Sequence, residues 1–334
     1  MTSARTAPAG DGSLVFTQDD APGICRIRRG RGFSYHDNTG KLIRDKATRS
    51  RIASLAIPPA YTDVWICADA NGHLQATGRD ARGRKQYRYH PAYRARQDEA
   101  KFARLGKFGA CLPAIRAQVE KDISARGTSR RCVIATIIHL LDCTAIRIGN
   151  ETYARQNRSY GLTTLTCRHV QLDASAIRFR FNGKGGRKWD VSLRHRRVAK
   201  VLRGLQDLPG QQLFRYRDGE DLRSVTSDDI NAYLREIGGE TFSAKDFRTW
   251  CGTVTAMAAL CELRQQDEPP ATEAAIRQAV AIAADALGNT PTICRQSYIH
   301  PQVLGAYRKD APVFRKTDAD AAETAVLKLL KRRR

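Results

Sequence analysis

The chain has few acidic residues for its size, and it lacks a long apolar run. Its 334 residues include 34 Asp and Glu against 57 Lys and Arg, which gives a formal net charge of +23. No stretch approaches the ~20 consecutive apolar residues of a membrane-spanning helix, and we identify no signal peptide. Such a positive field concentrates polyanions, although an anionic membrane surface would be attracted as well. We therefore expect a cytoplasmic protein, without a membrane-embedded part, whose partner is a polyanion.

Cysteine pairs at metal-binding spacing are also missing. The nine cysteines are scattered, none forms a Cys-x-x-Cys motif, and none has a histidine at zinc-finger spacing. Several lie in apolar stretches, where a free cysteine behaves as a small hydrophobic residue. The sequence therefore predicts reduced structural thiols, no metal site and no cofactor.

Short β-prone segments separated by turns fill residues 22–95. Asn71-Gly72, between Val64–Ala68 and His73–Thr77, is typical of a β-hairpin. One helix is expected over Lys46–Leu55, before a pair of prolines. This part of the chain is predicted to be a small β-rich domain.

Helical periodicity dominates after residue 95. The predicted helices are Gln97–Leu105, Leu112–Ser124, Arg131–Ile146, Arg194–Leu205, Thr226–Ile237, Ser243–Leu263 and Thr272–Leu287. A β interlude is expected over Thr163–Leu172, Ile177–Phe181 and Lys188–Leu193. The sequence thus predicts an α+β fold with a larger, mainly α-helical domain over residues 96–315. A flexible leader is expected over residues 1–21 and a solvated basic tail over residues 316–334, with DNA contact as the alternative for the tail.

Lys184 stands at the tip of a predicted hairpin, within Gly183-Lys184-Gly185-Gly186. Glycines at such a tip let the backbone and the lysine approach a phosphate closely. The segment is not a P-loop, because the required Gly-x-x-x-x-Gly-Lys-Ser/Thr spacing is missing. The alternative is an exposed lysine on an ordinary turn.

Two arginines accompany this lysine. Arg248 lies near the start of a helix with Ser243 as its expected N-cap and Asp246 as the capping-box partner. It follows the core residue Phe247, so we expect it to point toward an edge, where its planar fork could bind two phosphate oxygens. Arg147 follows an apolar helix and is expected at a helix end or sharp turn. For Arg248 alone, a surface ion pair is the alternative.

Further basic residues are interleaved with aromatic and hydroxyl side chains, which suits a sugar–phosphate surface. In the larger domain the candidates are Arg155, Arg158, Tyr160 and Arg168. In the smaller domain they are Arg84, Lys85, Gln86, Tyr87 and Tyr89. Tyr87 and Tyr89 would share one strand face, with Gln86 opposite, and the segment could reach base edges in a major groove. A solvated charged strand is the alternative.

Taken together, these segments resemble the poxvirus-like type IB DNA topoisomerases, including their bacterial members, over roughly residues 32–308. The motifs that carry the resemblance are Arg79-x-x-Arg-Gly-Arg-Lys-Gln-Tyr-x-Tyr, Arg147-Ile-Gly-Asn-Glu-x-Tyr, Tyr160-Gly-Leu-Thr-Thr-Leu, Gly183-Lys-Gly-Gly, Lys245-Asp-Phe-Arg-Thr-Trp and Asn289-Thr-Pro-x-Ile-x-x-x-x-Tyr298. It implies a fold of the type IB topoisomerase and tyrosine recombinase kind.

The resemblance also implies roles for individual residues. Tyr298, which follows the helix ending at Gly288, would be the nucleophile, and Arg147, Lys184 and Arg248 would be catalytic. Asn289 stands where poxviral members carry histidine, and asparagine resembles what some bacterial members use. Either side chain can donate a hydrogen bond to a phosphate oxygen, but only histidine can add charge.

The implied reaction relaxes supercoils of either sign in duplex DNA through a transient 3′-phosphotyrosyl intermediate, without ATP or metal. Lys184 would act as general acid, because a lysine can lose its proton where an arginine normally cannot. A monomer associated with the nucleoid is the simplest expectation.

Two other classes remain open. A tyrosine recombinase would use similar chemistry, but its usual His-x-x-Arg box is here Lys245-Asp-Phe-Arg248. A non-enzymatic DNA-architectural protein would explain the charge but not the ordered arginine, lysine and tyrosine motifs.

Overall fold

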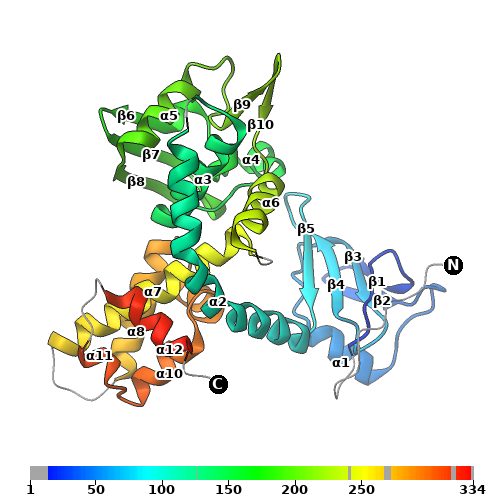
Figure 1. Cartoon of the computed structure of the whole chain (residues 1–334). Coiled ribbons are helices and arrows are strands. Elements are labelled where there is room, and N and C mark those ends of the chain that lie inside the picture. Colours follow the sequence, from blue (N-terminus) through cyan, green and yellow to red (C-terminus); the bar gives the residue numbers. More distant parts are fainter. Residues whose placement is uncertain (1–13, 126, 240–241, 267–271, 317–320, 332–334) are drawn as a thin grey trace. The chain divides into compact units, whose positions relative to one another are not determined.

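The computed structural model describes residues 14–125, 127–239, 242–266, 272–316 and 321–331. The chain forms two compact units that divide between Ala100 and Lys101 (Figure 1). Each unit has its own cluster of buried apolar side chains. The smaller unit is built on a sheet and the larger one is mainly helical, so the expected α+β class is confirmed.

The smaller unit contains a five-stranded antiparallel sheet in the order β2-β1-β3-β4-β5. Its strands are β1 (Gly23–Arg29), β2 (Gly32–His36), β3 (Thr62–Cys67), β4 (Leu74–Arg79) and β5 (Lys85–Tyr89). Helix α1 (Lys46–Ser54) begins at Asp45, whose carboxylate accepts two backbone N–H groups. Ile52 of α1 packs with Ile66 of β3 in the core. Because β3 pairs with β4 on either side of Asn71-Gly72, the predicted hairpin is confirmed.

Residues 14–21 differ from the predicted flexible leader. Leu14 is buried, and Val15 exchanges backbone hydrogen bonds with Asn71 and His73 at 3.0 and 2.8 Å. The Thr17 hydroxyl donates to the Leu74 carbonyl at 3.2 Å. These backbone partners fix the segment against the sheet although its own sequence has no periodicity. Residues 1–13 lie outside the described residues.

The other helices follow the small sheet, and the first of them starts in the last residues of the smaller unit. They are α2 (Pro91–Ile123), α3 (Arg130–Thr144), α4 (Glu151–Asn157), α5 (Arg196–Gln206), α6 (Ser227–Gly238), α7 (Ala244–Gln266), α8 (Glu273–Leu287), α9 (Pro291–Ser297), α10 (Pro301–Arg308), α11 (Val313–Lys316) and α12 (Ala322–Lys331). The predicted helices around residues 131–146, 194–205, 226–237, 243–263 and 272–287 are confirmed within a few residues. Helices α4, α9, α10 and α11 were not predicted.

Helix α2 corrects the prediction of two separate helices over residues 97–105 and 112–124. It runs without a break through Pro113. A proline inside a helix costs about 3 kcal/mol, but Leu105, Phe108, Leu112 and Ile115 continue one buried stripe across it. Burial of that stripe outweighs the local penalty, because most helical stability in proteins comes from tertiary packing.

A second sheet, in the order β6-β7-β8, lies within the larger unit. Its strands are β6 (Val170–Asp173), β7 (Ala176–Asn182) and β8 (Lys188–Arg194). The predicted strand over residues 163–172 is wrong in its first part, where 3₁₀ turns occupy Leu162–Thr164 and Cys167–His169. The Thr164 hydroxyl hydrogen-bonds the backbone of Gly161 there. Such local side-chain bonds offer the backbone an alternative to a strand ladder.

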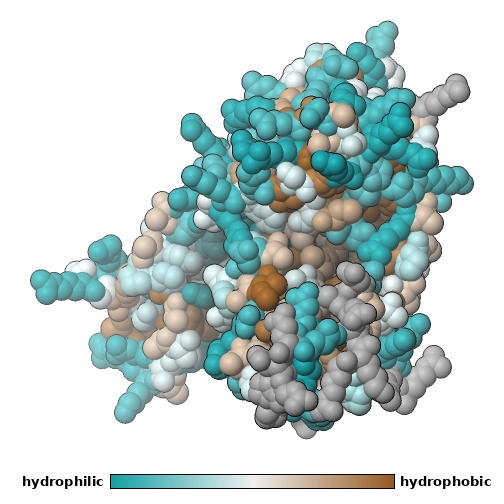
Figure 2. Space-filling view, turned by 90° about the vertical axis from the view of Figure 1, so that its left-hand side faces the viewer, coloured by the Kyte–Doolittle hydropathy of each residue, from teal (hydrophilic) through white to brown (hydrophobic). Residues whose placement is uncertain are grey.

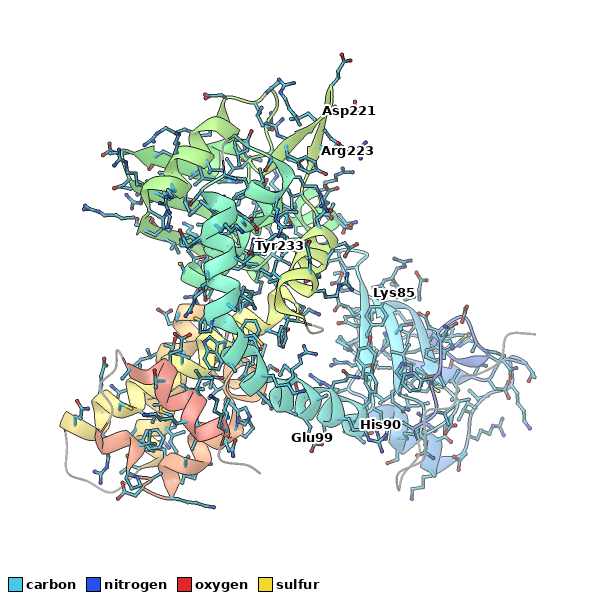
Figure 3. The ribbon with its side chains drawn as sticks, in the orientation of Figure 1. Lys85, His90, Glu99, Asp221, Arg223 and Tyr233 are labelled. Atoms are coloured by element: carbon cyan, nitrogen blue, oxygen red, sulfur yellow. The ribbon has the colours of Figure 1, made fainter. Side chains whose placement is uncertain are left out.

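A buried polar network ties α2, α3 and α6 together. Tyr233 of α6, labelled in Figure 3, donates a hydrogen bond to Asp122 of α2. The same carboxylate accepts from Arg131 of α3 at 2.8 Å. Asp221 and Arg223 in Figure 3 mark a hairpin that was not predicted, formed by β9 (Arg215–Asp218) and β10 (Asp221–Ser224).

The C-terminal segment is not a solvated tail where the structure describes it. Helix α12 packs against α7 through Ala322, Ala325 and Val326, which are buried. Glu323 accepts hydrogen bonds from Arg116 and from the Trp250 indole. The basic residues of the segment concealed this apolar face, whose members recur at helical spacing. Residues 317–320 and 332–334 lie outside the described residues.

Hydrophilic side chains predominate over the face shown in Figure 2. Among the helices of the described residues, none combines the length and the apolar character that crossing a membrane requires.

Candidate active site

Arg147 is held at the end of helix α3, as predicted. The helix ends at Ala145, which adopts a left-handed conformation with φ 53°. The Arg147 carbonyl then accepts the N–H of Leu162 at 2.9 Å. A Cβ atom added to Gly161 would lie 2.5 Å from the Arg147 carbonyl oxygen, so only glycine permits this crossing of the two segments. The motifs at 147 and 160 are therefore two halves of one turn that fixes Arg147.

Arg248 is buried, so the prediction that it points toward an edge is wrong. It lies in the first turns of α7, and only 4% of its surface is exposed. Its Nη1 donates to the Ala145 carbonyl at the end of α3, and its Nη2 donates to the Leu287 carbonyl at the end of α8 at 2.7 Å. The carbonyl ends of helices carry partial negative charge and need donors. Arg248 thus joins two helix ends.

Half of the expected capping box at the start of α7 is present: the Asp246 N–H donates to the Ser243 backbone carbonyl at 2.9 Å and not to the Ser243 hydroxyl. The Asp246 carboxylate accepts the Ser243 backbone N–H at 2.8 Å and the Ser243 hydroxyl at 2.9 Å. Asp246 also pairs with Arg104 of α2 at 3.0 Å. These contacts fix the helix turn from which Arg248 projects.

Tyr298 directly follows α9, a short helix that sequence reasoning missed. The missed signal was Thr290-Pro291, an N-cap followed by proline in the first turn. The Thr253 hydroxyl of α7 donates to the Tyr298 carbonyl at 3.2 Å. A Cβ atom on Gly252 would lie 2.8 Å from the same carbonyl oxygen, so a glycine lets the tyrosine backbone approach α7. The Tyr298 ring centroid lies 5.2 Å from Arg248 Cζ.

Lys184 lies at the tip of the β7–β8 hairpin, as predicted, and its side chain is exposed. The tip is a 3₁₀ turn over Lys184–Gly186. Arg187, directly after the turn, donates to the Asp285 carbonyl at 2.8 Å and pairs with its carboxylate at 2.7 Å. This contact between Arg187 and Asp285, the hairpin latch, connects the hairpin to α8.

One pocket of about 410 Å³ brings the four predicted catalytic side chains together. Arg147, Lys184, Arg248 and Tyr298 all line it, although they come from four different parts of the chain. Two further lysines, to which the sequence analysis assigned no role, line it as well: Lys101 and Lys245. Lys101 donates to the carbonyl of Ser297, next to Tyr298, at 2.8 Å.

Asn289 lies beside this pocket. Its Oδ1 accepts a hydrogen bond from Arg147 Nη2. The amide nitrogen of Asn289 therefore points away from this arginine nitrogen. Asn289 Nδ2 and Arg248 Nε are buried donors for which the described residues provide no acceptor. Buried polar groups are rarely left unpaired without a functional reason. An anionic oxygen bound here would supply acceptors.

Burial and mutual repulsion shape the electrostatics of the two arginines. Burial lowers the pKa of Arg147 to about 10, and the positive charge of Arg248 acts in the same direction. Burial also lowers the pKa of Arg248, against the opposing effect of Tyr298. Both guanidiniums keep their charge at neutral pH. One buried and one half-buried cation at close quarters favour the binding of an anion between them.

The predicted DNA-contact residues of the smaller unit are partly paired within it. Tyr87 and Tyr89 are 48% and 39% exposed, and their rings stack with centroids 6.1 Å apart, so the predicted common face is confirmed. Arg84 pairs with Asp80 at 2.7 Å, and Lys85 pairs with Asp19 at 2.5 Å. Gln86 donates to the same Asp80 carboxylate at 3.0 Å.

In the larger unit, Arg155, Arg158 and Arg168 are exposed and Tyr160 lines the pocket. Arg155 pairs with Glu151 at 3.5 Å. Arg168 donates to the Tyr160 hydroxyl at 3.3 Å.

Sequence reasoning missed a cluster of Glu120, His139 and His195 outside the pocket. Their potential ligand atoms lie within 4.8 Å of one another. His195 Nδ1 accepts the Val198 N–H at 3.2 Å, which leaves the proton of a neutral ring on Nε2. Since Nε2 faces the Glu120 carboxylate at 3.2 Å, the geometry favours a hydrogen bond over a metal bond there.

Comparisons with known proteins place this chain in a family. A family model described as "Eukaryotic DNA topoisomerase I, catalytic core" matches residues 90–325. Another, described as "Bacterial DNA topoisomerase IB, N-terminal domain", matches residues 32–80. The fold and the matches define the class as DNA topoisomerase I enzymes, which are isomerases.

Among similar proteins, the DNA topoisomerase 1B of Acanthamoeba polyphaga mimivirus is 31% identical over 320 residues, which cover 92% of this chain and 94% of that protein. The DNA topoisomerase 1B of Vaccinia virus (strain Copenhagen) is 22% identical over 284 residues, covering 82% of this chain and 87% of that protein. The DNA topoisomerase 1 of Mycosarcoma maydis is 26% identical over 208 residues, covering 56% of this chain and 20% of that protein. The chain belongs to the type IB DNA topoisomerase family and acts on DNA.

Proposed function

We propose that this protein relaxes positive and negative supercoils by breaking one DNA strand at a time through a 3′-phosphotyrosyl intermediate. The observation that carries the proposal is the single pocket lined by Arg147, Lys184, Arg248 and Tyr298. Two buried donors in and beside the pocket, Arg248 Nε and Asn289 Nδ2, have no acceptor among the described residues, which supports the binding of a phosphate oxygen beside Tyr298.

In the proposed cleavage step, the Tyr298 oxygen attacks the phosphorus and its phenolic proton leaves to water. The bond between phosphorus and the 5′ oxygen breaks, and Lys184, assisted by Arg147, gives a proton to that departing oxygen. Arg147, Arg248 and Asn289 donate to the non-bridging oxygens, where negative charge accumulates in the transition state. Rotation of the nicked duplex relaxes it, and attack by the 5′ hydroxyl reverses the chemistry.

The proposal includes independence of ATP and of metal ions. The phosphotyrosyl bond conserves the energy of the broken diester, so resealing requires no nucleotide. Positive charge at the phosphate comes from guanidiniums, in the role that metal ions have in many phosphoryl-transfer enzymes.

We further propose that the protein works as a monomer on duplex DNA, in the cytoplasm and associated with the nucleoid. The proposed DNA contacts are Arg84, Lys85, Gln86, Tyr87, Tyr89, Arg155, Arg158, Tyr160 and Arg168. The net charge of +23 supports salt-sensitive binding of the phosphate backbone.

The test is incubation with negatively supercoiled plasmid in EDTA without ATP, with one aliquot quenched in SDS and probed for DNA-linked protein. We expect a ladder of relaxed topoisomers and a covalent adduct that disappears in Tyr298→Phe. The Tyr298→Phe variant should still bind DNA, because only the nucleophilic oxygen is removed. An adduct that survives the substitution would reject Tyr298, and a strict need for Mg²⁺ would reject the metal-free mechanism.

A further inference from the structure

A second groove of about 570 Å³ adjoins the reaction pocket, and Tyr160 lines both. Four basic residues line this groove: Arg158, Arg168, Arg180 and Lys188. Two of them precede β6 in the sequence, and the other two lie on β7 and β8. Arg180 and Lys188 were not among the residues that the sequence singled out. We call this cavity the flanking groove.

Positive charge in the flanking groove is poorly compensated. Among the residues that the structure describes, Asp190 is the one acidic residue that lines it. This carboxylate pairs with Arg178, outside the groove, at 2.7 Å and with Arg180 at 3.2 Å. Within the described part of the chain, Arg158, Arg168 and Lys188 form no ion pair. All four basic residues are exposed, so an anion in the groove would meet them directly.

The backbone around the flanking groove is held in place. The Tyr160 N–H donates to the Asn182 carbonyl at 2.8 Å, which fixes the segment carrying Arg158 against β7. Arg158 itself adopts φ 48°, a backbone conformation that residues other than glycine seldom adopt. Strain of this kind persists where the surroundings impose it, and it gathers at functional sites.

The register of the sheet places the two strand residues near one another. Asn182 of β7 pairs with Lys188 of β8, and Arg180 pairs with Asp190. Residues two apart on a strand share a face, so Arg180 and Lys188 lie on the same face of the sheet. Beneath them, the Phe181 and Trp189 rings stack at 2° in the core. The sheet is therefore a firm support for both cations.

We propose that the flanking groove binds backbone phosphates of the DNA strand next to the phosphate that reacts in the pocket. The proposal rests on the proposed function, and it adds Arg180 and Lys188 to the residues that position the strand. Phosphate contacts of this kind carry no sequence information, but they fix the register of the duplex on the protein. Because Tyr160 borders both cavities, a strand that leaves the pocket past Tyr160 enters the groove.

The first experiment measures the salt dependence of DNA binding in the Tyr298→Phe background, where no covalent adduct forms. The logarithm of the binding constant falls as the logarithm of the salt concentration rises. Each lost phosphate contact makes this slope less steep by ~0.9. We therefore expect the two added substitutions, Arg180→Ala and Lys188→Ala, to make the slope less steep by about 1.8. Asp190 keeps Arg178 as its partner in this variant. The matched control is Arg194→Ala, an exposed cation at the other end of β8 that does not line the groove, and its slope should stay at the parent value.

A second experiment locates the contact. After the cleavage position is mapped from the adduct of the otherwise unchanged protein, single phosphates around it are replaced by neutral methylphosphonates. One or two positions next to the cleaved bond should weaken binding by the protein with an intact groove and leave binding by the double variant unchanged. The proposal would be overturned if the double variant and its parent had equal salt slopes. It would also be overturned if each methylphosphonate weakened binding by the double variant as much as binding by its parent. Failure of the unchanged protein to form any adduct would instead overturn the proposed function, so the two failures are distinct.

Discussion

Arg248 and Lys184 line the same pocket from opposite environments. Arg248 is buried and donates to the carbonyl ends of two helices, whereas Lys184 is exposed on the tip of a hairpin. The backbone contacts of Arg248 keep its charge in one position before DNA binds, as electrostatic stabilisation of a transition state requires. A proton donor must instead approach the leaving oxygen and release a proton, and an exposed lysine has room to move. The difference suggests that the fold supports the fixed charges and leaves the proposed acid adjustable.

The largest expected effect is that of Arg248→Ala. It removes a guanidinium that satisfies two buried carbonyls, so we expect a loss of about 3 kcal/mol in the free energy of unfolding. Adduct formation should fall by about a hundredfold or more, because transition-state charge loses a donor. Thermal unfolding and single-turnover cleavage measure the two quantities. Arg248→Lys is the control, and it should recover part of the stability but little of the rate, since lysine lacks the planar fork.

Lys184→Ala should change the cleavage rate without changing the stability of the fold. The side chain is exposed, so the free energy of unfolding should change by less than about 0.5 kcal/mol. Loss of the proposed proton donor should slow cleavage by roughly a hundredfold. A substrate with a 5′-thio leaving group needs no proton, and the variant should cleave it at nearly the parent rate. If the variant were equally slow on that substrate, Lys184 would not be the acid.

Arg187→Ala would sharpen the comparison by releasing the hairpin latch. The Arg187 and Asp285 side chains are 38% and 83% exposed, so their ion pair contributes at most about 1 kcal/mol to stability. We expect cleavage to slow by a few-fold, because the hairpin carrying Lys184 loses its contact with α8. Asp285→Asn retains a hydrogen-bond acceptor and should slow cleavage less. An unchanged rate for Arg187→Ala would show that DNA alone positions the hairpin.

The smallest expected effect concerns pH and lies outside the pocket. Burial lowers the pKa of His139 from its ordinary value of 6.5, and the neighbouring His195 acts in the same direction. The unfolded state then binds more protons, so the stabilising contribution is present above about pH 6.5 and is lost as the pH falls below it. Thermal unfolding measured between pH 7 and pH 5 should show a declining Tm. His139→Gln should decline less steeply, and an identical slope would contradict this assignment.

Much of the fold could be predicted because local signals and tertiary packing agree. Helix α8 lies between its N-cap Thr272 and its C-cap Gly288, and both cap residues are recognisable in the sequence. Alternating apolar residues likewise predicted β7, and the structure buries Ile177, Phe179 and Phe181 on one face of that strand. Where the two levels disagree, prediction failed. Two helices were predicted over residues 97–105 and 112–124, but a buried stripe joins them into the single helix α2, which runs through Pro113.

The sequence by itself determined which chemical groups this protein brings to DNA. The charge of +23, the glycines around Lys184 and the order of the arginine, lysine and tyrosine motifs are all visible without coordinates. Only the tertiary structure decided their environments. It buried Arg248 between two helix ends, left Asn289 Nδ2 without an acceptor among the described residues, and gathered Arg180 and Lys188 into the flanking groove. The reason is physical: burial, hydrogen-bond partners and mutual repulsion depend on segments that are distant in sequence, whereas side-chain chemistry is local.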